Sequence, residues 1–171
     1  EIKDEHLVGK DLSGTILTGA NLQNAKLSNL NFSGKDLSGT ILSGANLSGV
    51  IMNNADLSNA NLSGADLSDS MITETLMSNA NLTGANIINS KLYGSTLNNA
   101  NLSGADLSDS NLSGADLSDS NLSGSILTNT DLQNANLSGA DLSDSTLVST
   151  LMAHANLTGI DLSGSDLSGA I

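Results

Sequence analysis

Four pairs of aspartates are the residues of this sequence that could most readily bind a metal ion. Each pair encloses a leucine and a serine, and the pairs are Asp66/Asp69, Asp106/Asp109, Asp116/Asp119 and Asp141/Asp144. Calcium takes about six to eight oxygen ligands, whereas each pair supplies two carboxylates on either side of a leucine, with serine hydroxyls nearby. We therefore interpret the pairs as turn-forming, solvated residues, and we predict neither a metal site nor a cofactor.

Residues suited to catalysis or phosphate binding are present, but not in the required combinations. Serines are abundant, yet the two histidines, His6 and His154, are far apart in the sequence and there is no cysteine. A nucleophile needs an adjacent base, and zinc needs a set of Cys, His or carboxylate ligands. The segment Gly9-Lys10-Asp11 lacks the hydroxyl residue and the upstream glycine of a phosphate-binding loop. We predict no catalytic residue, no small-molecule substrate and no enzymatic activity.

The charge of the chain is strongly negative and unevenly distributed. Eighteen acidic residues outnumber five lysines, for a net charge of −13, and the last lysine is Lys91. The acidic surface predicted for the C-terminal half consists of Asp106, Asp109, Asp116, Asp119, Asp131, Asp141, Asp144, Asp161 and Asp166. Negative charge opposes nucleic-acid backbones and anionic membranes, and no stretch approaches the roughly 20 apolar residues of a membrane span. We expect no direct nucleic-acid binding and no membrane insertion, which leaves a second copy or another protein as the partner.

The chain is organised as a five-residue repeat. An apolar residue recurs at every fifth position from Ile2 to Leu167, and 27 of these 34 central positions are leucine. The other seven are Ile2, Phe32, Met52, Ile72, Met77, Ile87 and Met152. A small residue, such as Ala45 or Ala65, usually stands two positions before the centre. A period of five fits neither the roughly 3.6 residues of a helical turn nor the strict alternation of a strand.

A turn is predicted within every repeat. Two positions after the centre, the sequence carries Gly, Asn or Asp in 31 of 34 repeats, and all 17 glycines lie in this column. Gly and Asn adopt a positive φ at low cost, as the third residue of a type II turn requires. A chain that turns a corner every five residues closes a square after about twenty, and successive coils then stack at about 4.8 Å. The leucines should point into a dry interior lined by Ala, Ser and Thr.

These columns resemble the pentapeptide-repeat family, whose motif is approximately Ala-(Asp/Asn)-Leu-x-x. The sequence carries it as Ala-Asn-Leu-Ser-Gly at 45–49 and as Ala-Asp-Leu-Ser-Asp at 65–69, 105–109, 115–119 and 140–144. The resemblance implies an all-β solenoid, the right-handed quadrilateral β-helix of the family, with about 8.5 coils of four pentapeptides each. We expect a single domain over 1–171 in which the first coil, about 1–11, is atypical.

Two sets of residues depart from the repeat. Lys35 occupies the small-residue column, where a buried, unpaired ammonium is costly. We expect either a local bulge or a side chain that extends to solvent at this position. Glu74, Ser149 and His154 occupy the turn column in place of Gly, Asn or Asp, and we predict a different turn type at these three residues.

The column before each centre points outward and normally holds Asn or Asp. Its apolar exceptions define a predicted interaction patch that consists of Ile51, Met71, Leu76, Leu151 and Ile171. Residues twenty apart share a side of the square, so Ile51 and Met71 should be neighbours in successive coils, and the same row continues to Ile171. A stacked, exposed apolar pair of this kind suggests an interface.

The first functional hypothesis is a non-enzymatic structural or interaction scaffold, a rigid acidic rod that self-assembles end to end. The repeat runs from Ile2 to Leu167 without a helix or polar segment that would cover a terminal coil. Uncovered edges are templates for added strands, and solenoids generally need capping repeats. The lysines lie in the N-terminal half and the C-terminal half is acidic, which favours head-to-tail stacking.

The second hypothesis is DNA mimicry, which the family resemblance implies because fluoroquinolone-resistance members resemble B-DNA and bind DNA gyrase. B-DNA carries one charge per about 1.7 Å of axis. The 18 acids of this chain, on a rod of about 40 Å, give one per about 2.2 Å. Two features argue against mimicry: the centres are leucine where those members favour phenylalanine, and the sequence shows no projecting loop.

Overall fold

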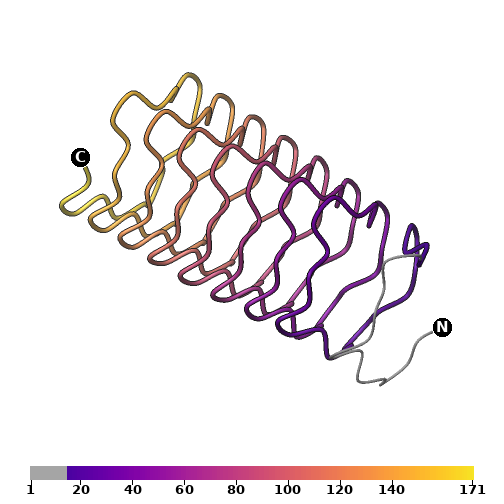
Figure 1. The fold of residues 1–171 in the computed structure, drawn as a ribbon. Coiled ribbons are helices and arrows are strands. Elements are labelled where there is room, and N and C mark those ends of the chain that lie inside the picture. The colour runs from indigo at the N-terminus through magenta and orange to yellow at the C-terminus, as the bar shows by residue number, and fades with distance from the viewer. Residues whose placement is uncertain (1–14) are drawn as a thin grey trace.

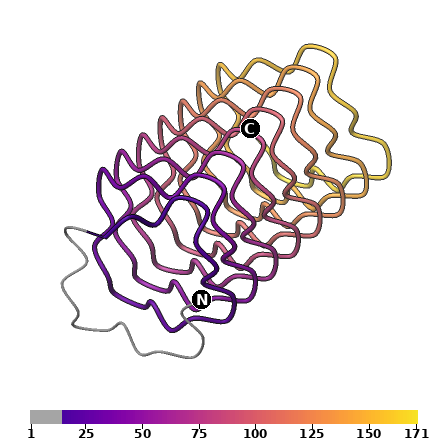
Figure 2. The same ribbon diagram turned by 90° about the vertical axis from the view of Figure 1, so that its right-hand side faces the viewer.

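The computed structural model describes residues 15–171, which form a four-sided coil that winds along a straight axis (Figure 1). Parallel bridges join residues twenty positions apart, from Asn21 with Ile41 to Thr146 with Asp166. Each bridge involves a single residue on either side, and no helix occurs between residues 15 and 171. Figure 2 shows the corners of successive coils in rows along the rod. The predicted coil of twenty residues is confirmed, whereas the predicted atypical coil at about 1–11 lies outside the described residues.

At every corner, the chain turns at a residue whose backbone has the left-handed conformation. The backbone φ lies between 54° and 72° at each fifth residue from Gly19 to Gly169. The next N–H group donates to the carbonyl three positions back, as from Ala45 to Leu42 (3.0 Å). A positive φ at the third residue, without one at the second, is the signature of a type II turn. The predicted corner is therefore confirmed.

The same turn also forms at the three positions where we predicted a different one, so that prediction is wrong. Glu74, Ser149 and His154 have φ values of 54°, 58° and 62°. The Glu74 N–H donates to the Tyr93 carbonyl of the next coil (3.1 Å), as the turn residues of other repeats do. Such a conformation costs a residue with a side chain about 1–2 kcal/mol. Bonds to neighbouring coils impose it regardless of residue type, and at His154 the bond comes from the preceding coil, where the Asn134 N–H donates to the Ala153 carbonyl (3.0 Å).

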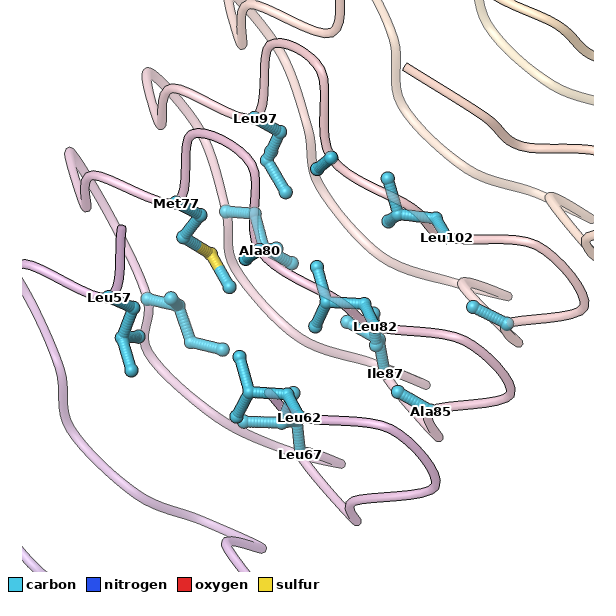
Figure 3. Packing of buried hydrophobic residues seen from close by; sticks show 14 of the residues in the cluster. Leu57, Leu62, Leu67, Met77, Ala80, Leu82, Ala85, Ile87, Leu97 and Leu102 are labelled. Atoms are coloured by element: carbon cyan, nitrogen blue, oxygen red, sulfur yellow. The ribbon is translucent and has the colours of Figure 1, made fainter. Parts of the chain in front are cut away.

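The interior is a stack of leucine layers. The central residues from Leu22 to Leu147 are at most 1% exposed. In Figure 3, Leu57, Met77 and Leu97 lie in successive coils and point inward, with small residues such as Ala80 beside them. Burial of each leucine contributes about 1.5–3 kcal/mol. The predicted buried leucine interior with a lining of Ala, Ser and Thr is confirmed for the coils from Leu22 to Leu147.

Backbone hydrogen bonds join each coil to the next in a fixed pattern. The Leu82 N–H donates to the Asn101 carbonyl (2.7 Å), and the Gly84 N–H donates to the Ser103 carbonyl (2.9 Å). In return, the Asn101 N–H donates to the Ala80 carbonyl (2.9 Å). All four sides repeat these bonds from Leu22 to Leu147, so each of these coils is stabilised chiefly by its two neighbours, as in other solenoids.

Serines at one corner replace the bond within the turn by a bond between coils. The Ser70 N–H donates to Ser90 Oγ (3.1 Å), and the Ser90 hydroxyl donates to the Leu67 carbonyl (2.7 Å). Ser110 Oγ accepts the Ser90 N–H in the same way (3.1 Å). Buried hydroxyls in this column therefore satisfy backbone groups, which explains how polar residues line a dry interior.

The backbone at Lys35 is regular, so the bulge that we considered there does not form. The Lys35 N–H donates to the Phe32 carbonyl (3.0 Å), and the Asp56 N–H donates to the Lys35 carbonyl (2.9 Å). Both are the bonds of an ordinary corner. The Lys35 side chain is half-buried, as expected for an aliphatic stem that extends from the column toward solvent.

Replacement of Ser125 by alanine should stabilise the protein. Within residues 15–171, Ser125 Oγ is the buried side-chain polar atom that has no hydrogen-bond partner. Loss of an unpaired buried hydroxyl should increase the free energy of unfolding by up to about 1 kcal/mol. Ser90→Ala is the matched comparison, because it removes two inter-coil bonds and should decrease that free energy by about 1–3 kcal/mol. Thermal unfolding followed by circular dichroism measures both, and equal losses in the two variants would contradict the assignment.

Candidate interaction surfaces

Outward Asn and Asp side chains are held by the turns that they precede. Asp106 Oδ1 accepts the Ser108 N–H (3.0 Å) and the Ser108 hydroxyl (2.6 Å). Asn111 Oδ1 accepts the same two groups of Ser113 (2.9 and 2.7 Å). These are the side-chain-to-backbone bonds of Asx turns. The carboxylates therefore occupy fixed positions along the rod.

Aspartates alternate with asparagines along several rows of the surface. Asn86 Nδ2 donates to Asp66 Oδ1 (3.0 Å), and at the following corner Asn89 Nδ2 donates to Asp69 Oδ1 (2.7 Å). Equivalent bonds join Asn136 to Asp116 and Asn129 to Asp109. Because coils lie about 4.8 Å apart, an amide between two carboxylates separates charges that would otherwise repel at short range.

The four aspartate pairs occupy two different positions in the coil. The first member of each pair points outward from a side, and the second is a turn residue with a φ between 55° and 60°. The interpretation of the second members as turn residues is therefore confirmed. Among residues 15–171, no three His, Cys, Asp or Glu side chains gather into a group that could hold a metal ion.

Serine hydrogen bonds lower the pKa of three exposed aspartates. The Ser38 hydroxyl, followed by the Ser38 N–H, holds the pKa of Asp36 below its ordinary value. The Ser168 hydroxyl is the main cause of the lowered pKa of Asp166. For Asp161 the Ser163 N–H is the larger cause and the Ser163 hydroxyl the smaller. Each hydrogen bond favours the ionised carboxylate.

Charge is distributed unequally over the four sides of the rod. The side formed by 31–34, 51–54 and their equivalents at intervals of twenty, which we name the Met71 side, carries Glu74, Lys91 and Asp131. The other described acids lie on the remaining sides: Asp36, Asp56, Asp116 and Asp119 on one, Asp141, Asp144 and Asp161 on another, and Asp66, Asp69, Asp106, Asp109 and Asp166 on the last. The described part of the rod thus has three acidic sides and one nearly neutral side.

The Met71 side also carries four of the five residues of the predicted patch. Its outward row, the Met71 row, consists of Asn31, Ile51, Met71, Lys91, Asn111, Asp131, Leu151 and Ile171. A bridge joins Ile51 to Met71, so the predicted contact between their coils is confirmed. Met71 is 38% exposed and Ile171 is 78% exposed. Leu76, the fifth residue, is exposed on the adjacent side, where it bridges to Asp56, so the patch is divided between two sides.

Tyr93 is an exposed residue of the Met71 side that our sequence analysis did not assign to the patch. It follows Lys91 by two positions and is 41% exposed, while Thr73, at the equivalent position of the preceding coil, is buried. The position after each centre is usually Ser or Thr. The aromatic residue in that column could therefore have identified Tyr93 as part of the exposed surface. Ile41 and Ile126 are exposed singly on other sides.

The repeat model of the pentapeptide-repeat family matches the chain over nearly its whole length. The matched segments are 6–34, 31–69, 60–99, 75–114, 110–147 and 147–171. The chain belongs to the pentapeptide-repeat family. Comparison with curated protein sequences found no match.

Solved structures of other pentapeptide-repeat proteins share the fold. A trypsin-treated form of QnrB1, a plasmid-mediated fluoroquinolone resistance protein, is 22% identical with a TM-score of 0.73, over 87% of this chain and 84% of that chain. A pentapeptide-repeat protein of the Arabidopsis thaliana thylakoid lumen is 27% identical with a TM-score of 0.52, over 75% of this chain and 80% of that chain. These neighbours support the right-handed quadrilateral β-helix that the sequence predicts.

The C-terminal coil of this pentapeptide-repeat chain presents an open leucine layer. Leu157 and Leu167 are each 38% exposed, whereas the central residues of the preceding coil are buried. Among the described residues, no carbonyl accepts the N–H groups that point away from this coil, which belong to Leu157, Gly159, Leu162, Gly164, Leu167 and Gly169. The coil therefore offers both apolar surface and unpaired donors at one end.

The serine bonds predict a difference between two exposed aspartates. Ser168→Ala should raise the pKa of Asp166 toward its ordinary value, because the hydroxyl is the main cause of the lowered pKa. Ser163→Ala should raise the pKa of Asp161 less, since alanine retains the N–H that is the main cause there. Carboxyl chemical shifts followed by NMR from about pH 2 to 6 measure both values. Equal shifts in the two variants would contradict the assignment.

The same bonds determine how stability depends on pH. A carboxyl whose folded pKa lies below its unfolded value of about 3.9 contributes stability above that value, and the contribution is lost as the pH falls through the folded pKa. We therefore expect the unfolding midpoint to fall on acidification below about pH 4, with a smaller fall in Ser168→Ala than in the wild type. An unfolding midpoint that rises on acidification would contradict this sign.

Proposed function

We propose that this chain is a non-enzymatic interaction scaffold, a rigid acidic rod that associates end to end and offers its sides to other proteins. The observation that carries the proposal is the regular set of bonds between coils, which holds four sides of outward residues at a fixed spacing. The coil at residues 152–171 adds exposed leucines and N–H groups that no described carbonyl accepts, a surface to which another coil can add. The partners are a second copy or another protein, and the proposal includes no nucleic acid, membrane lipid or small-molecule substrate.

Rigidity of the rod follows from the bonds between coils. Bridges join every pair of successive coils on all four sides, from Asn21 to Asp166. Side-chain ladders add further bonds along the outside, such as that from Asn86 to Asp66. A rod of this kind holds surface residues at a regular spacing of about 4.8 Å. Such an arrangement suits a scaffold, whose partners need binding positions at fixed distances.

The chemistry of the open coil favours another coil of the same repeat as its cover. In each described coil, the carbonyls of the outward residues, such as Asn101 and Ser103, accept N–H groups from the coil before it. The open coil offers the matching donors, including those of Leu157 and Gly159. Stacking of a regular coil from a second copy on this end would therefore continue the hydrogen-bond pattern of the rod, and its leucine layer.

End-to-end association should depend on the open leucine layer. Leu157→Asp combined with Leu167→Asp adds two charges to that layer and should abolish association, because burial of an unpaired carboxylate is costly. Ser163→Asp combined with Ser168→Asp is the matched control, since it adds the same charge to exposed corners of the same coil. Sedimentation velocity over a concentration series, with negative-stain microscopy at low and high salt, measures the assembly. A wild-type chain that is monomeric at every concentration would contradict this part of the proposal.

DNA mimicry is the second candidate function, and the observation that favours it is the fixed placement of carboxylates on three sides of the rod. Serine donors and asparagine amides hold these groups in regular rows, as with Asp106 and Asp66. The target of such a mimic would be a DNA-processing enzyme such as DNA gyrase. Two observations weigh against it: other residues interrupt the aspartate rows, as Asn86 does between Asp66 and Asp106, and the Met71 side is nearly neutral.

A supercoiling assay separates the two candidates. We expect the protein, added in up to a hundredfold molar excess, to leave DNA gyrase supercoiling unchanged, because a scaffold has no affinity for a DNA-binding channel. A plasmid supercoiling gel measures this, with an acidic protein of similar net charge as the control for nonspecific inhibition. Inhibition by this chain, but not by the control, would favour DNA mimicry over the scaffold.

A further inference from the structure

The residue types of the Met71 row are arranged symmetrically about its centre, except that the two charged residues have opposite signs. From Ile51 onward the row runs apolar, apolar, Lys, Asn, Asp, apolar, apolar: Ile51, Met71, Lys91, Asn111, Asp131, Leu151 and Ile171. The central residue is Asn111, and the two charges on either side of it have opposite signs. Such a row is self-complementary, as the surface of a two-fold dimer must be.

We propose that the Met71 side is an interface between two antiparallel copies of this chain. The two-fold axis lies at Asn111 and runs in the plane of the interface, perpendicular to the rods. It therefore places each outward column against the same column of the second copy. The residues that face one another are Ile51 with Ile171, Met71 with Leu151, Lys91 with Asp131, and Asn111 with itself.

Other alignments of the same two sides lose this match. A shift by one coil places Met71 against Asp131 and Lys91 against Asn111, which buries apolar residues against polar ones. A shift by two coils, or a parallel alignment, places Lys91 against Lys91. Like charges in direct opposition are destabilising. The row thus specifies one register and one direction.

Neither charge of the row has an ion-pair partner among the described residues, although Asp131 accepts the Gln133 N–H (3.0 Å). Among residues 15–171, neither Lys91 nor Asp131 forms an ion pair, and the bridge partners of Lys91 are Met71 and Asn111. The acid and the base of one chain are two coils apart, about 10 Å. In the proposed pair each lysine faces an aspartate of the second copy, and symmetry produces this contact twice.

The corner next to the row follows the same symmetry. Glu74 and His154 lie two coils on either side of Gly114 in the turn column, so the proposed pair places Glu74 near His154 of the second copy. Both residues adopt a positive φ that Gly or Asn would adopt at lower cost. A role at the edge of an interface accounts for their presence in that column. Tyr93 faces Gln133 in the same register.

Charge also selects a second copy over a different partner at this side. Two rods that each carry a net charge of −13 repel one another, and the other three sides carry most of the described acids. The Met71 side brings the two rods together with the fewest acids in the contact. A basic partner would instead favour the three acidic sides.

The contact area predicts a weak dimer. Seven coils at about 4.8 Å and a side about 10 Å wide give on the order of 300 Å² per copy, well below the roughly 800 Å² of a standard interface. We therefore expect a monomer–dimer equilibrium that is visible only at protein concentrations of about 0.1–1 mM. This surface is distinct from the open leucine layer, so either association can fail without the other.

A charge exchange tests the register. Lys91→Asp should weaken the dimer about tenfold, because it places two pairs of like charges in contact. Asp131→Lys should do the same. The double variant, Lys91→Asp with Asp131→Lys, should restore the dimer to within about threefold of the wild type. Sedimentation equilibrium of the full chain measures each dissociation constant, and all variants should carry the Leu157→Asp and Leu167→Asp substitutions to exclude end-to-end contacts.

Two controls separate the interface from general charge effects. Lys26→Asp makes the same charge change on another side and should leave the dimer unchanged. Ile51→Asn with Met71→Asn should retain the circular dichroism spectrum and weaken the dimer, since both residues point outward. A monomer at about 1 mM, an unchanged dimer in Lys91→Asp, or a double variant without rescue would each overturn the proposal.

Cross-linking tests the position of the axis independently. The chain has no cysteine, so a single introduced thiol is the only reactive one. Asn111→Cys should form a covalent dimer with a short bis-maleimide, because two residues on the axis lie about 10 Å apart across packed sheets. Asn101→Cys, a matched outward residue on another side, should not. Equal yields at the two positions would place the axis elsewhere.

Discussion

The left-handed turn residue is the constraint on which the rest of the structure depends. A positive φ at every fifth residue, from Gly19 to Gly169, closes the square and brings residues twenty apart into contact. Only then do the leucines form layers and the outward residues form rows. The behaviour of Glu74, Ser149 and His154 shows that the constraint belongs to the stack as a whole. Bonds to adjacent coils hold the turn, even where the residue itself would favour another conformation.

Stacking at about 4.8 Å brings like charges close together, and the outer columns reduce this repulsion in two ways, although Asp36 with Asp56 and Asp141 with Asp161 remain direct neighbours. Like residues in successive coils would place carboxylates at a distance where they repel. Asparagine amides separate many of them, as Asn86 follows Asp66 and Asn89 follows Asp69. Glycine follows others, as Gly139 follows Asp119, where the aspartate side chain extends over the space that a Cβ would fill. The acidic character of the rod is thus compatible with its repeat.

Much of this architecture could be predicted from the sequence because each position of the five-residue repeat has a single structural role. The leucine centres, the turn column and the contact between Ile51 and Met71 all follow from counting in fives and twenties. The failures concern residues whose conformation depends on neighbouring coils. Turn propensity suggested a different corner at Glu74, and the cost of a buried ammonium suggested a bulge at Lys35, but the bonds of adjacent coils determined the backbone at both. Leu76 was grouped with Met71, although a corner of the square separates their sides.

Side-by-side and end-to-end association are compatible in this geometry. An antiparallel pair centred on Asn111 aligns the coil of Ile171 with that of Ile51 in the second copy. The leucine layer that contains Leu157 and Leu167 faces along the axis, whereas Met71 and its row face across it. Because the two surfaces are perpendicular, pairing on the Met71 side leaves the open coil free to stack. A scaffold with both contacts would be a paired rod that extends along its axis, while its three acidic sides stay free for other partners.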